Sequence, residues 1–148
     1  MDRNEADLRR AIAELHLTPR EVVICNRTQA AVVVGRAKQA FVGSSDPRWW
    51  WASLSKPAVA VDYPAGEAFR HLLEFVPQGE ERCWLVVEND EDGPWHVLDT
   101  AVEAIPGIIA ECSPFEYYLI GKEFNWLIAE NHHKQLIVVT DARPRSDS

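Results

Sequence analysis

The chain has 148 residues, of which 47% are hydrophobic and 26% charged, and this balance excludes a chain that is disordered throughout. The length predicts one domain at residues 1–141, followed by a flexible tail at residues 142–148. The net charge of −8 is unevenly spread, because residues 1–76 carry 10 basic and 9 acidic groups whereas residues 77–148 carry 5 and 14. An acidic second half repels nucleic-acid phosphates and favours a basic partner, so we predict no binding to nucleic acid.

The cysteines and the hydropathy indicate where the protein works. Cys25, Cys83 and Cys112 are an odd number without close pairing, which is typical of reduced thiols in the cytoplasm. No apolar run approaches the roughly 18 residues that a membrane span needs. The first residues have the pattern of an amphipathic helix and not of an export signal. We therefore predict a soluble cytoplasmic protein that does not associate with membranes.

Helical and strand patterns alternate along the first half of the chain. Leu8, Ile12 and Leu15 recur at helical spacing, and Asn26 or Thr28 is suited to cap a second helix. The predicted order is a helix over residues 5–17, a short strand over 21–25, a helix ending near residue 42, a short helix over the tryptophan segment and a strand over 58–63. A helix that begins at Thr18 is an alternative to the first strand.

The second half combines two more helices with five strands. The predicted order is a helix over residues 65–76, a hairpin of strands over 82–89 and 95–99, a helix over 100–112 kinked at Pro106, and strands over 115–121, 125–130 and 135–141. This order predicts an α+β fold. Its mostly antiparallel sheet has five to seven strands, with a C-terminal three-strand meander and helices packed mainly on one face.

Several catalytic signatures are absent from the sequence. It contains no phosphate-binding glycine loop, no G-x-S-x-G motif, no H-E-x-x-H motif and no C-x-x-C pair. We therefore predict no catalytic residues, no cofactor and no bound metal. Whether the protein is an enzyme stays open, although these absences favour a protein that is not one.

The segment "DPRWWWASL" is the most unusual stretch of the chain, because Trp49, Trp50 and Trp51 are consecutive. Consecutive side chains fan out over a wide arc in a helix and alternate between faces in a strand, so one core does not readily accept all three. We expect two rings in the core and one at the surface. Tryptophan and arginine are common at binding hot spots, and Arg48 together with an exposed ring would bind a partner.

A second candidate site lies in the meander. The segment "AENHHKQL" brings together Glu130, His132 and His133, whose side chains bind metals or transfer protons in other proteins. If Lys122 and Glu123 form the turn, Glu116 pairs with Ala129, and the two carboxylates lie on opposite faces of the sheet. A register slip of one residue would place them on the same face.

The side chains around Glu116 are expected to separate by strand alternation. Glu116 and Tyr118 should occupy the wetter face of the sheet, while Tyr117 and Leu119 enter the core. We count Glu116 and Tyr118 among the candidate binding residues with those of the tryptophan segment and the meander. These sequence segments therefore supply two candidate surfaces for a partner.

The segments "PRWWWASL" and "FEYYLIGKEFNWLIAENHHKQLIVV" resemble an uncharacterised bacterial family, a domain of unknown function, from about residue 43 onward. The resemblance implies no particular activity. In size and element order the chain is also remotely similar to the SUKH superfamily of toxin-immunity proteins, which are small cytosolic α+β domains that bind toxins. That likeness is one of fold and carries no residue motif.

The leading hypothesis is a cytoplasmic binding protein, of the immunity type, whose acidic half attracts a basic protein partner and blocks it sterically. The alternative is a small hydrolase or transferase with a pocket formed by Trp51, Glu116, Tyr118, Glu130 and His132. A homodimer that buries the exposed aromatic rings is a third alternative.

Overall fold

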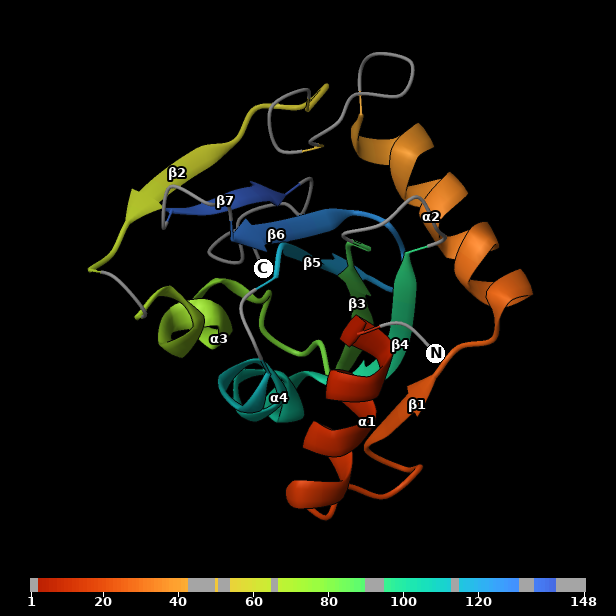
Figure 1. Ribbon diagram of the computed structural model, residues 1–148. Coiled ribbons are helices and arrows are strands. Elements are labelled where there is room, and N and C mark those ends of the chain that lie inside the picture. The colour runs from red at the N-terminus through yellow and green to blue at the C-terminus, as the bar shows by residue number, and fades with distance from the viewer. Residues whose placement is uncertain are drawn as a thin grey trace.

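A single seven-stranded antiparallel sheet forms the centre of the computed structural model (Figure 1). The structure describes residues 3–42, 50, 54–64, 67–89, 95–112, 115–130 and 135–140. In spatial order the strands are β1 (Val22–Ile24), β4 (His96–Ala101), β3 (Arg82–Val87), β5 (Tyr117–Gly121), β6 (Trp126–Glu130), β7 (Gln135–Thr140) and β2 (Val59–Asp62). The helices are α1 (Arg3–Glu14), α2 (Arg27–Phe41), α3 (Leu72–Phe75) and α4 (Ile105–Glu111), with 3-10 turns η2 (Ala68–His71) and η3 (Val102–Ala104). The predicted α+β class, the antiparallel sheet and the C-terminal meander β5–β6–β7 are confirmed.

The helices lie mainly on one face of the sheet, as predicted. Helices α1, α3 and α4 pack together on the first face, where Leu8, Leu72 and Ile108 join the buried side chains of the strands. Among the four described helices, α2 is the one that lies on the second face (Figure 1). The buried side chains of α2 are Ala30, Val33, Ala37 and Phe41, whose spacing is that of one helical stripe.

The second face of the sheet is also covered, and this shows that the predicted exposure of Tyr118 is wrong. Tyr118 is not on a wetter face, because its exposed fraction is 0% and it belongs to a core that also contains Trp50, Ile120 and Leu127. Tyr117, on the first face, is equally buried at 2%. With both faces covered, strand β5 is apolar throughout, and alternation between polar and apolar residues is lost, as in other strands buried on both sides.

The ends of several elements differ from the predicted ones for local reasons. Thr18 does not begin a helix; its backbone N–H and hydroxyl both lie near the Glu21 carboxylate in a turn that leads into β1. Helix α2 begins after Asn26, whose side chain accepts a hydrogen bond from the Gln29 backbone N–H, while the Gln29 side chain accepts one from Asn26. Pro106 lies in the first turn of α4, where a missing N–H costs nothing, and not in the middle of a longer helix, where it would cause the predicted kink.

The register of the meander also differs from the predicted one. Tyr117 pairs with Glu130 and Tyr118 with Ala129, a shift of two residues. The cause is a longer turn between the strands, in which Phe124 adopts a left-handed φ of 56°. Because the shift is two residues and not one, each side chain keeps its predicted face of the sheet.

Candidate functional site

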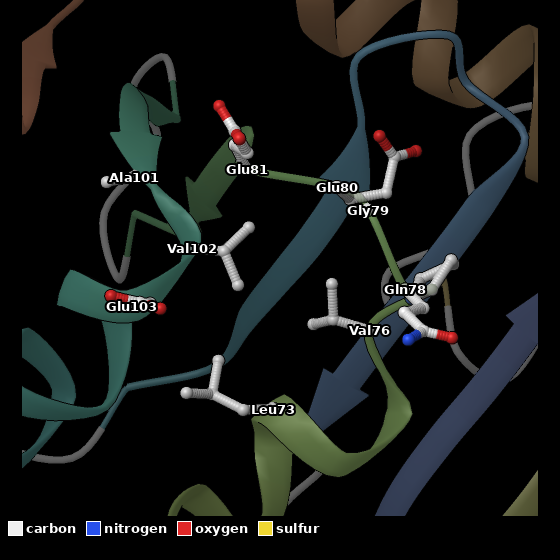
Figure 2. Close-up of a pocket in the computed structure, with 10 residues that line it drawn as sticks. Leu73, Val76, Gln78, Gly79, Glu80, Glu81, Ala101, Val102 and Glu103 are labelled. Atoms are coloured by element: carbon white, nitrogen blue, oxygen red, sulfur yellow. The ribbon is translucent and has the colours of Figure 1, made fainter.

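A pocket of about 520 Å³ opens at one end of the sheet, between the segment that joins α3 to β3 and the point where β4 continues into η3 (Figure 2). Segments far apart in the sequence, near residues 73–81 and 101–103, form its walls. They are held together by a backbone hydrogen bond of 2.9 Å from the Val102 N–H to the Glu81 carbonyl. The volume lies within the range of about 300–1,000 Å³ that is typical of ligand pockets.

The floor of the pocket is apolar. The side chains of Leu73, Val76 and Val102 point toward one another across it (Figure 2). Val102 is almost fully buried, whereas 40% of Leu73 is exposed. Leu73 is therefore one of the few large hydrophobic side chains that the described residues leave exposed, and it is the one among these that lines the pocket.

The edge of the pocket is acidic. Glu80, Glu81 and Glu103 lie around the floor, and their carboxylates point away from its centre (Figure 2). Within the residues that the structure describes, no lysine, arginine or histidine forms an ion pair with any of these three carboxylates. An apolar floor with uncompensated negative charge around it attracts a ligand that is both aliphatic and cationic.

Glu80 is the one of the three that the fold holds in a defined position. Its Oε1 accepts a hydrogen bond of 3.0 Å from the indole Nε1 of Trp126, which is 1% exposed. The preceding turn brings it there, since Gly79 adopts a φ of 92°, and the Glu80 N–H donates to the Pro77 carbonyl. One edge of the pocket is thus anchored to the core beneath strand β6.

A contrasting acidic group lies on the second face of the sheet. Asp99 Oδ1 is 3.0 Å from Arg82 Nε and 2.9 Å from Lys122 Nζ, and that ammonium lies 3.6 Å from the ring centre of Trp84. Burial by itself would raise the pKa of Asp99, but the hydrogen bonds from Lys122 and Arg82 lower it below its ordinary value. Asp99 therefore stays ionised and its charge is balanced by Arg82 and Lys122, unlike the charges of the pocket carboxylates.

The structure places some of the predicted binding residues in the core. Trp50 is 2% exposed, with its ring centre 5.1 Å from that of Tyr118 and 4.7 Å from that of Trp95. Burial assigns the rings of Trp50 and Tyr118 to the core of the second face, which agrees with the expectation that part of the tryptophan segment is interior. Trp95 is half-buried and completes this aromatic cluster.

The predicted carboxylates of the meander are not brought together. Glu130 lies on the first face, where its Oε1 accepts a hydrogen bond of 2.5 Å from the Tyr117 hydroxyl. Burial, together with the charge of Glu130, raises the pKa of Tyr117 well above its ordinary value. Glu116 precedes β5 and, by strand alternation, belongs to the face of Tyr118, so the predicted separation of Glu116 and Glu130 is confirmed.

The other predicted site residues lie outside the described residues; these are Arg48, Trp49, Trp51, His132 and His133. Within the residues described, no group of three or more His, Cys, Asp or Glu side chains is placed to hold a metal ion. In that same part of the chain, no helix is long and apolar enough to cross a lipid bilayer.

Sequence reasoning missed the pocket because its walls come from a turn and from a strand end, neither of which has a periodic pattern. The signal that was available is the acidic pair Glu80–Glu81 directly after Gly79, within the half of the chain that carries most of the negative charge. That signal locates charge but not a cavity, because the cavity depends on how η3 packs beside α3.

Comparison with known proteins identifies a family. The family described as "Family of unknown function (DUF6756)" matches residues 3–146, which include both segments that carried the resemblance in the sequence. No curated protein matches the chain, and no solved structure does. The match extends over nearly the whole chain, and this protein therefore belongs to the DUF6756 family, a family of unknown function.

Proposed function

We propose that this protein binds a basic protein partner through its acidic second half and acts by occupying the partner's surface. The observation that carries the proposal is the pocket with an apolar floor and, at its edge, the carboxylates of Glu80, Glu81 and Glu103, which form no ion pair within the described part of the chain. Electrostatic attraction of this kind accelerates encounter with a basic partner, and apolar contact then slows dissociation.

An immunity-type protein of the bacterial cytoplasm fits this proposal. Such a protein acts by steric blocking, which needs complementary shape and charge but no chemistry. The size of the domain, its α+β architecture and the net charge of −9 in residues 77–148, which carry 5 basic and 14 acidic groups, support this interpretation. The hydrolase or transferase alternative gains no support from Glu116 and Glu130, which lie on opposite faces of the sheet.

Binding of charged peptides at two salt concentrations tests the proposal. The probes are a twelve-residue peptide of alternating lysine and serine and a matched peptide of alternating glutamate and serine, titrated by isothermal calorimetry. We expect the basic peptide to bind and the acidic one not to, with an affinity that falls severalfold as screening shortens the Debye length from roughly 30 Å at 0.01 M salt to about 8 Å at 0.15 M. Equal binding of both peptides, or an affinity that salt leaves unchanged, would refute charge-driven binding.

A further inference from the structure

We infer that the pocket recognises a segment of its partner in which basic and aliphatic residues alternate, with an aliphatic side chain on the floor and flanking ammonium or guanidinium groups at the acidic edge. This inference rests on the proposed function and states which chemistry the site selects. It assigns the partner's anchor to one place on the molecule and not to the acidic half as a whole.

The floor supplies the first half of the recognition. Leu73 is 40% exposed, whereas Val102 is nearly buried, so an apolar group that enters the pocket removes water mainly from Leu73. Contact between aliphatic groups is favourable and has no directional requirement. Charge alone does not account for such a floor, because an exposed leucine side chain contributes nothing to electrostatic attraction.

The edge supplies the second half. The carboxylates of Glu80, Glu81 and Glu103 point outward from the floor, where the charged end of a lysine or arginine remains partly hydrated while its aliphatic stem covers apolar surface. Glu80 is already oriented by its hydrogen bond from Trp126, which lowers the entropy lost when a cation binds there. Glu81 and Glu103 are exposed and hold negative charge on two further sides.

Other ligand classes fit the pocket less well. Phosphates of nucleic acids or anionic lipids would be repelled by three carboxylates that no described basic residue pairs with. A divalent cation needs several oxygen ligands that converge, and no cluster among the described residues offers them. A basic aliphatic segment satisfies both the floor and the edge.

Two peptides and two matched double variants test the inference. The peptides are twelve-residue chains of alternating lysine and leucine or lysine and serine, which have equal charge. The pocket variant is E81Q/E103Q, and the control is E14Q/E67Q, which also removes two exposed carboxylates but none that lines the pocket. A third variant, L73S, alters the floor alone, and circular dichroism verifies that every variant is folded.

We expect the wild-type protein to bind the lysine–leucine peptide at least fivefold more tightly than the lysine–serine peptide, and L73S to lose most of this preference. We expect E81Q/E103Q to weaken binding of the lysine–leucine peptide by about fivefold to tenfold, the sum of two modest ion pairs, and E14Q/E67Q to change it less than twofold.

The possible failures are distinguishable. Equal weakening by the two double variants, or equal affinity for the two peptides, would overturn the assignment to the pocket while leaving charge-driven binding intact. If neither peptide binds the wild-type protein at low salt, the proposed function and this inference are overturned together.

Discussion

Replacing Gly121 by alanine tests how closely the core is packed beneath the pocket. Gly121 ends β5, and the indole of Trp126 on the neighbouring strand lies directly over it. A Cβ at position 121 would stand 2.6 Å from Cδ1 and 2.8 Å from Cε2 of that ring, distances that no carbon contact sustains. Since those atoms belong to the buried ring and not to a flexible side-chain end, the indole must move or the strands must separate.

The expected cost has two parts. Overpacking of a dense core destabilises a protein by about 1–3 kcal/mol. Displacement of the indole also breaks the hydrogen bond of 3.0 Å from Trp126 Nε1 to the Glu80 carboxylate, and bonds to charged groups contribute about 1.5–3 kcal/mol. We therefore expect G121A to lower the free energy of unfolding by about 3–5 kcal/mol, a large share of the roughly 5–15 kcal/mol that a domain has in total.

Urea unfolding followed by tryptophan fluorescence measures this effect. With a slope of about 2 kcal/mol per molar urea, the midpoint should fall by roughly 1.5–2.5 M. The matched control is G35A, in helix α2, where an added Cβ meets nothing within 4 Å. That variant should gain about 0.5–1 kcal/mol, because alanine favours a helix interior over glycine. A G121A midpoint within 0.3 M of wild type, a margin of about 0.6 kcal/mol at this slope, would refute the packing argument.

Three further predictions concern the cap of α2, one ion cluster and one buried thiol. N26A should lower the free energy of unfolding by about 1 kcal/mol through loss of the cap on the Gln29 N–H, and N26D, which keeps an acceptor, should lose much less in the same urea assay. D99N should be less stable than wild type at pH 7, since Arg82 loses its charged partner. Because the pKa of Asp99 is lowered in the folded state, the difference in stability between D99N and wild type should shrink as pH falls below about 4. An undiminished difference at pH 3 would contradict the ion-pair origin. Burial raises the pKa of Cys83 to about 12, whereas an unfolded thiol ionises near pH 8.5. Above pH 9 the free energy of unfolding of the wild type should therefore fall relative to that of C83A by up to about 1.4 kcal/mol per pH unit. Parallel pH profiles of the two proteins would argue against a raised pKa of Cys83.

Much of the local structure could be predicted from the sequence because local patterns report local burial. The spacing of Leu8 and Ile12 predicts α1, the acidic turn between two apolar runs predicts the β3–β4 hairpin, and the short connections predict the meander. The cap of α2 at Asn26, one of the two residues suited to that role, and the unequal charge of the two halves also follow from residues close together in the chain.

The tertiary structure decided what depends on contacts between distant residues. Covering of the second face by α2 buries Tyr118. The unbroken apolar run of β5 is typical of a strand covered on both sides, but it does not say which distant element covers the second face. The register depends on the four-residue turn between Gly121 and Trp126, in which Phe124 is left-handed, and a turn of two residues is compatible with the same alternation. The acidic pocket exists because packing brings η3 beside the end of α3, and local periodicity carries no information about which turns will meet in space.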